Sequence, residues 1–195
     1  DRCVLSEISS GAFFQIMSHT CAANVAHALG ICGRVISPDA ACASGAVGVG
    51  LGYEAIAEVR QDAMICGGAD ELHPIVTACF DLVQASSHRF NATPERTPRP
   101  FDSDRDGTVC GAGGGALVLE SEGSARARGA EVLAEVVGFD TLADGGHLAQ
   151  AESDSIRRCL GNALDKAGLM PDRIDYVNAH GTGTLSGDRA EAQAI

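Results

Sequence analysis

The spacing of apolar and polar positions predicts a chain in which helices and strands alternate. Residues 153–168 carry the clearest amphipathic helix pattern, and Gly168 followed by Pro171 predicts where that helix ends. A second helix is predicted over residues 19–29, with glycines at its end. Short apolar runs predict strands over residues 34–37, 63–68, 109–121, 131–139 and 173–184. This order of elements is typical of an α/β fold.

Residues 43–60 have apolar positions at helical spacing but include glycines at 45, 48, 50 and 52. Each glycine costs about 1 kcal/mol relative to alanine inside a helix. We therefore expect this helix to pack very closely against neighbouring backbone. The run at 63–68 is expected to be a wholly buried strand, residues 124–129 a short helix, and the proline-containing stretch 87–105 a surface loop.

The chain is predicted to form two α/β units, residues 1–130 and 131–195, with no low-complexity linker between them. Residue 1 is not methionine, and residues 187–195 read as a helix without a stop signal. We expect the chain to be an excerpt of a longer protein.

Composition narrows the classes of function. The chain has 26 acidic and 14 basic residues and a formal charge of −12, which disfavours binding to nucleic acid. No apolar stretch reaches the length of a membrane span and the first residues lack the pattern of a signal peptide, so a cytoplasmic protein without a membrane contact is expected. Most of the eight cysteines lie in apolar helix or strand patterns of a chain too large to need disulfides, which predicts reduced thiols, and the absence of C-x-x-C spacing disfavours a zinc site.

Cys42 is a candidate nucleophile. It lies in the sequence "DAACASG", between a predicted strand and the glycine-rich helix. The start of a helix favours a thiolate, and the small residues around Cys42 leave room for a substrate to approach, as in a nucleophile elbow. A structural thiol is the alternative, because free cysteine is commonly buried.

His180 is the second candidate. It follows an apolar run and begins the turn "HGTGT", where an imidazole is expected to face a cavity. A structural histidine is the alternative, but Cys42 and His180 together suggest a Cys/His pair.

Two further motifs are rejected. "DSDRDG" at residues 102–107 imitates a calcium loop, but Gly113 stands where the bidentate glutamate is required. "GAGGGA" at residues 111–116 imitates a dinucleotide fingerprint, but a strand pattern follows it instead of a helix.

Five motifs occur in a characteristic order, namely "DAACASG", "ICGGADE", "RPFDSDRDG", "GGALVLE" and "NAHGTGTLSGDRAEAQAI". Together they resemble a β-ketoacyl-acyl-carrier-protein synthase of the condensing-enzyme family. The resemblance implies a thiolase-like layered αβαβα fold, truncated at both ends. Residues 1–130 would be the later part of the N-terminal half and residues 131–195 the start of the C-terminal half. It also implies a homodimer, or a heterodimer of two ketosynthase-like subunits.

The resemblance implies roles for six residues. Cys42 would accept the acyl chain as a thioester and His180 would assist decarboxylation of malonyl-acyl carrier protein. Thr182 and Thr184 would line the substrate site, and Asp188 and Glu191 would be buried carboxylates behind it. No cofactor is implied apart from the phosphopantetheine arm of acyl carrier protein. Since the second histidine, the lysine before it and the phenylalanine loop of the family are absent here, we expect the chain alone to be inactive.

The chain departs from the family pattern at three places, of which the first two keep an alternative open and the third concerns the contact with carrier protein. Ala112 replaces the usual glutamate, Thr108 replaces the usual aromatic residue, and "VQASS" at residues 83–87 lacks the usual arginine that binds carrier protein. The expected replacements for that arginine are Arg89, Arg96 and Arg99. The alternative is a non-catalytic, chain-length-factor-like partner subunit, against which Cys42 argues. A thiolase acting on coenzyme A esters is disfavoured by "NAHGTGT".

Overall fold

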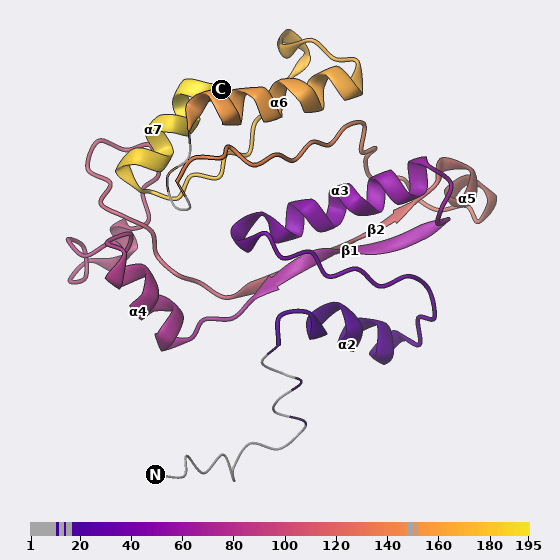
Figure 1. Cartoon of the computed structure of the whole chain (residues 1–195), viewed down its shortest axis with the longest axis horizontal. Coiled ribbons are helices and arrows are strands. Elements are labelled where there is room, and N and C mark those ends of the chain that lie inside the picture. The colour runs from indigo at the N-terminus through magenta and orange to yellow at the C-terminus, as the bar shows by residue number, and fades with distance from the viewer. Residues whose placement is uncertain (1–10, 12–13, 15–16, 148–149, 151) are drawn as a thin grey trace. The chain divides into compact units, whose positions relative to one another are not determined.

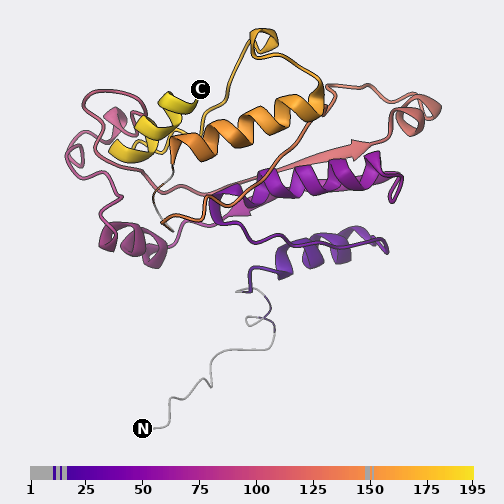
Figure 2. The same cartoon turned by 45° about the horizontal axis from the view of Figure 1, so that its top comes forward.

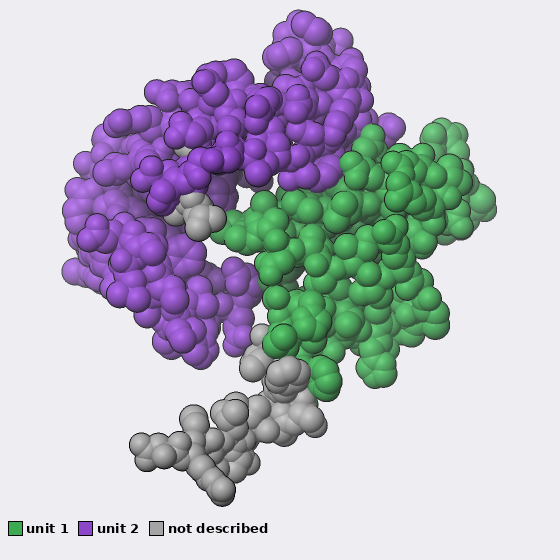
Figure 3. All heavy atoms as spheres, viewed as in Figure 1, with its two compact units in different colours: residues 1–69, 114–131 green, residues 70–113, 132–195 purple. Residues whose placement is uncertain are grey.

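The computed structural model describes residues 11, 14, 17–147, 150 and 152–195 (Figure 1). Cys3 therefore lies outside the described residues. The chain groups into two compact units, which are coloured separately in Figure 3. The first contains residues 1–69 and 114–131, and the second contains residues 70–113 and 132–195. The predicted division of the chain at residue 130 stays a prediction.

The first unit is built on a pair of antiparallel strands. Strand β1 (Ala63–Asp70) and strand β2 (Gly113–Glu120) form a two-stranded sheet and run in opposite directions in Figure 1. The backbone N–H of Ser121 donates to the Asp62 carbonyl at 3.0 Å and extends this pairing by one step. Helix α5 (Glu122–Ala127) follows directly and starts at Ser121, whose hydroxyl accepts the N–H of Ser124. Both predicted strands and the short helix are confirmed.

Helix α3 (Ser44–Ala57) lies along the strands in Figures 1 and 2. The prediction that its glycines permit close packing is confirmed. A Cβ atom at Gly48 would lie 3.3 Å from the carbonyl oxygen of Gly67, and one at Gly52 would overlap the Cys66 sulfur. The helix ends at Ala57, a few residues before the predicted end.

Three predicted strands are wrong. Residues 34–37, 131–139 and 173–184 have no strand assignment. Arg173 ends a short 3₁₀ turn, and Ile174 after it has an extended backbone. The apolar, β-branched composition favours an extended backbone, but a strand also needs a neighbour to receive its hydrogen bonds. The described residues supply such a neighbour only to β1 and β2.

The predicted burial of residues 63–68 is also wrong, and residues 173–178 of another apolar run are exposed as well. Within β1 only Cys66 is buried, because the packing of α3 covers one face of a sheet of two strands. Tyr176 is 80% exposed and Val177 is 43% exposed. The apolar composition of these runs therefore did not predict whether other elements would cover their side chains.

The described residues of the second unit form three α-helices. Helix α6 (Ser153–Ala167) ends at Gly168, which adopts φ +66° as the sequence predicts for a helix terminus. Helix α7 (Leu185–Ala194) packs against α6. Helix α4 (Pro74–Leu82) was not predicted. Its sequence signal is the proline at the first turn, preceded by His73, whose Nδ1 accepts the N–H of Ile75 at 3.2 Å.

The remaining sequence predictions concern helix α2 and the 87–105 loop. Helix α2 (Thr20–Leu29) is confirmed and ends at Gly30 with φ +65°. Residues 87–105 form a loop, as predicted, and contain only a short 3₁₀ turn at Pro94–Arg96. In the part of the chain that the structure describes, no helix is both long enough and apolar enough to cross a membrane.

Candidate active site

Cys42 is exposed on a tight turn that leads directly into α3. It occupies the middle of the 3₁₀ turn Ala41–Ala43. Ala41 has φ +48°, in the left-handed region that L-residues other than glycine rarely adopt. The Ser44 hydroxyl closes this turn, since it accepts the N–H of Ala40 at 2.9 Å and donates to the Ala41 carbonyl at 2.7 Å. A strained turn before a helix start therefore presents the thiol, as the sequence predicted, although no strand precedes it.

The other described thiols differ from Cys42 in burial or position. Cys66 is buried against α3, and this burial raises the pKa of its thiol. Burial also raises the pKa of the Cys159 thiol, as does the negative charge of the nearby Asp140. Cys21, Cys32 and Cys79 are exposed like Cys42. Exposure alone thus does not single out Cys42, and its position in the turn before α3 is what distinguishes it.

His180 is exposed at the start of a turn whose backbone is hydrogen-bonded to α7. The backbone N–H groups of His180 and Gly181 donate to the two carboxylate oxygens of Glu191, at 2.6 and 2.8 Å. Gly181 and Gly183 have φ +55° and +78°, which explains why glycine stands at both positions. Half-buried Glu191 therefore fixes the backbone that carries the imidazole.

Asp188 is the most deeply buried carboxylate, with 1% of its surface exposed. It accepts the N–H of Gly183 at 3.0 Å and the N–H of Phe101 at 2.7 Å. The Nε atom of Arg105 lies 3.2 Å from its Oδ2 atom. The expected burial of Asp188 is thus observed, whereas sequence reasoning missed Arg105, whose only signal was its place in "RPFDSDRDG".

The two threonines of the turn bond to each other and to the helix that follows. Their hydroxyl oxygens are 2.8 Å apart, and the Thr184 hydroxyl caps α7 by accepting the N–H of Gly187 at 3.2 Å. Thr182 and Thr184 remain predicted substrate-binding residues. The hydroxyl of Thr184 already has a structural partner.

The structure brings five of the six predicted site residues together. His180, Thr182, Thr184, Asp188 and Glu191 all lie in α7 or the turn before it, in the second unit. Cys42 lies in the first unit. The pairing of Cys42 with His180 therefore stays a prediction.

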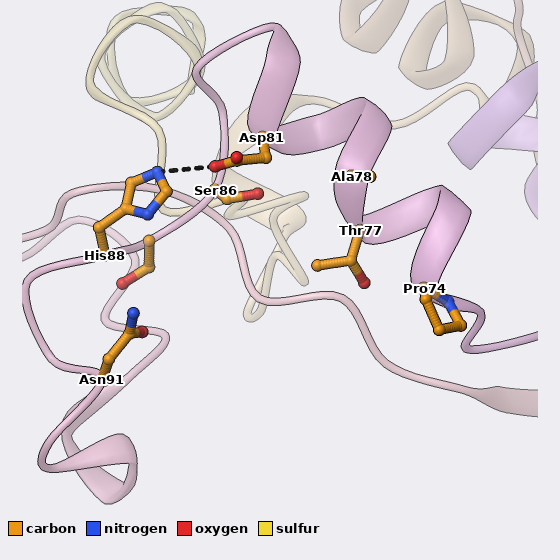
Figure 4. A pocket seen from close by; sticks show the side chains of 8 residues that line it. Pro74, Thr77, Ala78, Asp81, Ser86, His88 and Asn91 are labelled. Atoms are coloured by element: carbon orange, nitrogen blue, oxygen red, sulfur yellow. Dashed lines mark ion pairs between the residues drawn. The ribbon is translucent and has the colours of Figure 1, made fainter.

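A cavity lies between α4 and the loop that follows it. The cavity has a volume of about 500 Å³ and is lined by Thr77 and Asp81 of α4 and by Ser86, His88 and Asn91 of the loop, among others (Figure 4). His88 Nε2 lies 3.1 Å from an Asp81 carboxylate oxygen. A second cavity of about 350 Å³ includes Thr108, the residue that stands where the family pattern has an aromatic side chain. None of the six predicted site residues lines either cavity.

Arg89, Arg96 and Arg99 surround one aromatic ring. Their guanidinium carbons lie 5.7, 4.8 and 5.2 Å from the centre of the Phe90 ring. Such cation–π contacts hold the charged groups close together on the loop. Arg99 also pairs with Asp102 at 3.0 Å. The three arginines that were expected to replace the missing carrier-binding arginine therefore form one cluster.

The described residues contain no group of three His, Cys, Asp or Glu side chains that could hold a metal ion. In the rejected calcium motif, two of the carboxylates accept hydrogen bonds from nearby residues of the chain. Asp102 accepts the N–H of Asp104 at 2.7 Å, and Asp106 accepts the hydroxyl of Ser87 at 2.7 Å.

Comparison with protein families gives two adjoining matches. Residues 5–125 match the model described as "Beta-ketoacyl synthase, N-terminal domain". Residues 133–195 match the model described as "Beta-ketoacyl synthase, C-terminal domain".

Curated relatives include synthases of two kinds. The chain is 43% identical over 179 residues to the Streptomyces halstedii protein named "Putative polyketide beta-ketoacyl synthase 1", and this match covers 90% of this chain and 42% of the relative. It is 40% identical over 164 residues to 3-oxoacyl-[acyl-carrier-protein] synthase 2 of Mycobacterium tuberculosis. This match covers 83% of this chain and 39% of the relative. The chain thus spans less than half the length of these relatives.

Solved structures show the same likeness. A β-ketoacyl synthase from Burkholderia phymatum superposes with a TM-score of 0.93 at 45% identity, over 96% of this chain and 46% of that one. A type II polyketide ketosynthase in complex with its acyl carrier protein and bound to the hexaketide gives a TM-score of 0.90 at 30% identity, over 97% and 47%. The ishigamide ketosynthase/chain length factor gives 0.82 at 36% identity, over 92% and 43%.

Proposed function

Because the chain belongs to the β-ketoacyl synthase family, we propose that it carries the nucleophile and the first catalytic histidine of a synthase acting in fatty-acid or polyketide biosynthesis. Its fold is part of the thiolase-like fold of ketosynthases, as the sequence predicted. The observation that best supports the activity is the exposed position of Cys42 on a strained turn at the start of α3.

The proposed reaction has two stages. First, the Cys42 thiolate attacks the carbonyl carbon of an acyl thioester, and the carrier thiol leaves, so that the acyl group becomes bound to Cys42. Then a malonyl thioester loses carbon dioxide, and the electron pair of the broken C–C bond forms an enolate. The enolate carbon attacks the acyl carbonyl on Cys42, which forms the new C–C bond and releases the Cys42 thiolate.

In this proposal His180 donates a hydrogen bond to the enolate oxygen while carbon dioxide leaves. A donor held in place before the reaction stabilises developing negative charge most effectively. The two hydrogen bonds from the backbone of His180 and Gly181 to Glu191 support this role. They fix the backbone of the residue that carries the imidazole.

The proposed partner is acyl carrier protein, whose phosphopantetheine arm brings both substrates, with no other cofactor. A chain of charge −12 needs a local basic surface to receive an acidic carrier. The cluster of Arg89, Arg96 and Arg99 around Phe90 is such a surface. We also propose that the protein is cytoplasmic and pairs as a homodimer or with a second ketosynthase-like subunit.

The alternative proposal is a partner subunit without catalysis, similar to a chain length factor. Ala112 and Thr108 favour it, because both replace residues that the family pattern usually has. Cys42 disfavours it, because a partner subunit has no use for an exposed thiol at a helix start.

Thiol alkylation distinguishes these two proposals. The protein from its complete reading frame is treated with iodoacetamide, and modification of each cysteine is followed by mass spectrometry. For a synthase, Cys42 is expected to react about tenfold faster than exposed Cys21 and Cys79, because a strained turn presents its thiol between two alanines that leave room for the reagent. Buried Cys66 is the slow control.

A Cys42→Ala variant completes the test. It is expected to stay folded and to lose transfer of the acyl group to the protein. If Cys42 reacts no faster than Cys21, or if the variant still condenses acyl and malonyl thioesters, the synthase proposal is wrong. The 195-residue chain by itself is proposed to be inactive, since it lacks the family's second histidine.

A further inference from the structure

Arg105 joins two segments that are about 80 residues apart in the sequence. Its Nη1 atom donates to the carbonyl of Asp102 at 2.8 Å, within its own loop. Its Nε and Nη2 atoms donate to the carbonyls of Thr184 and Leu185, at 3.3 and 3.0 Å, where α7 begins. All three guanidinium nitrogens are thus engaged, and only 14% of the side chain is exposed.

The same guanidinium neutralises Asp188. Nε lies 3.2 Å from Oδ2 of this carboxylate, which is 1% exposed. Burying a carboxylate is costly unless an opposite charge and hydrogen-bond donors lie next to it. Arg105 supplies the charge, and the N–H groups of Phe101 and Gly183 are the other donors.

The two segments also approach each other closely at two glycines. A Cβ atom at Gly183 would lie 2.7 Å from the carbonyl oxygen of Gly107. One at Gly181 would lie 3.3 Å from Pro100 and 3.4 Å from the Phe101 ring. The turn that begins at His180 therefore lies directly on the 100–107 loop, and the pair of Arg105 and Asp188 fastens this contact.

We propose that Arg105 is a positioning residue for His180. It holds Asp188 and the first residues of α7 against the 100–107 loop, and so gives the His180 turn one conformation. This inference rests on the proposed function, in which His180 assists decarboxylation. Lysine cannot replace Arg105 fully, because one ammonium group lacks the planar fork that reaches the Asp102, Thr184 and Leu185 carbonyls together with Asp188.

The test separates the two stages of the reaction. Release of carbon dioxide from malonyl-acyl carrier protein reports on His180, and alkylation of Cys42 by iodoacetamide reports on the nucleophile. In the protein from its complete reading frame, Arg105→Met is expected to slow carbon dioxide release about tenfold or more, because a small misplacement of a catalytic group is costly. Alkylation of Cys42 is expected to stay at the wild-type rate.

Arg105→Lys covers the case in which Arg105→Met does not fold, since it keeps a positive charge near Asp188. It is expected to lower the rate of carbon dioxide release several-fold, with the KM for malonyl-acyl carrier protein unchanged. Arg157→Met is the matched control, because Arg157 also donates to an α7 carbonyl, that of Gln193, but at the far end of the helix. Both rates are expected to stay at wild type in this control.

Each outcome has one meaning. If the wild-type protein releases no carbon dioxide, the proposed function is wrong. If it does, and both Arg105 variants match its rate, the positioning role is wrong while the function stands. A parallel loss of carbon dioxide release and Cys42 alkylation in the Arg105 variants would also overturn the proposal, since it would mean that Arg105 only maintains the fold.

Discussion

Single carboxylates hold the loops of the second unit by accepting backbone N–H groups. Asp188 and Glu191 do so for the His180 turn, and Asp106 does so for the start of the 87–105 loop. Asp106 accepts the N–H groups of His88 and Arg89, both at 2.8 Å, and the hydroxyl of Ser87. An ionised carboxylate accepts hydrogen bonds at both oxygens, whereas protonation turns one of them into a donor.

The pKa of Asp106 makes its loop sensitive to acid. Burial on its own would raise this pKa, but hydrogen bonds from the Arg89 N–H, the Ser87 hydroxyl and the His88 N–H outweigh burial and lower it to about 2. Because the folded-state pKa is below the usual value of 3.8, the stabilisation is complete above about pH 4 and is lost as pH falls toward 2. We expect hydrogen exchange at His88 and Arg89 to accelerate over this range, relative to α6.

Asp106→Asn is the control for this prediction. An amide keeps one acceptor but adds a donor next to the Arg89 and His88 N–H groups. The variant is expected to exchange faster at neutral pH and to show no further step between pH 4 and 2. An acid step that persists in Asp106→Asn would assign it to another carboxylate.

At the scale of elements, glycine contacts determine how closely β1, β2 and α3 approach one another. Gly48 and Gly52 face Gly67 and Cys66 of β1, and Gly67 in turn lies against Gly115 and Ala116 of β2. A Cβ atom at Gly67 would overlap the Gly115 carbonyl oxygen and lie 2.8 Å from the Ala116 Cα atom. These neighbours are backbone atoms, which cannot rotate away as a side chain can.

Gly67→Ala is therefore expected to lower the free energy of unfolding by about 1–3 kcal/mol, the usual cost of overpacking. Gly115→Ala is the matched control, because it makes the same chemical change on the paired strand, where a Cβ atom meets nothing within 4 Å. Denaturant unfolding of the two variants gives the comparison. Equal losses of stability would show that the close approach at Gly67 is not what limits substitution.

At the scale of the whole molecule, the described residues leave many large apolar side chains exposed. Val59, Leu82, Leu133 and Tyr176 are each at least 80% exposed. The buried hydrophobic residues are small, and consist of Ala26, Ala55, Cys66, Ala125, Ala190 and Ala194. Where such side chains lie next to one another, exposed apolar surface favours association with other apolar surfaces.

We expect the isolated 195-residue chain to associate or to bind apolar dyes. Anilinonaphthalene sulfonate fluorescence should rise strongly on mixing, and sedimentation should show species larger than the 20.0 kDa chain. The protein from its complete reading frame is the comparison, with weaker dye binding expected. A monomeric chain without dye fluorescence would contradict this prediction.

The helices over Thr20–Leu29, Ser44–Ala57 and Ser153–Ala167, and the place of Cys42 at the start of one of them, could be predicted from the sequence. The physical reason is that helix hydrogen bonds join residues four apart, so that spacing, caps and glycines nearby in the sequence contain the information. The family was also recognisable, because its motifs are short stretches of neighbouring residues.

Only the tertiary structure decided which apolar runs became strands, because a strand needs a partner that can lie anywhere in the sequence. Residues 63–68 found such a partner in β2, while residues 131–139, which looked similar, did not. The same reason explains why Arg105 was missed. Its contacts with Thr184, Leu185 and Asp188 join residues about 80 positions apart, and no local spacing encodes a contact of that length.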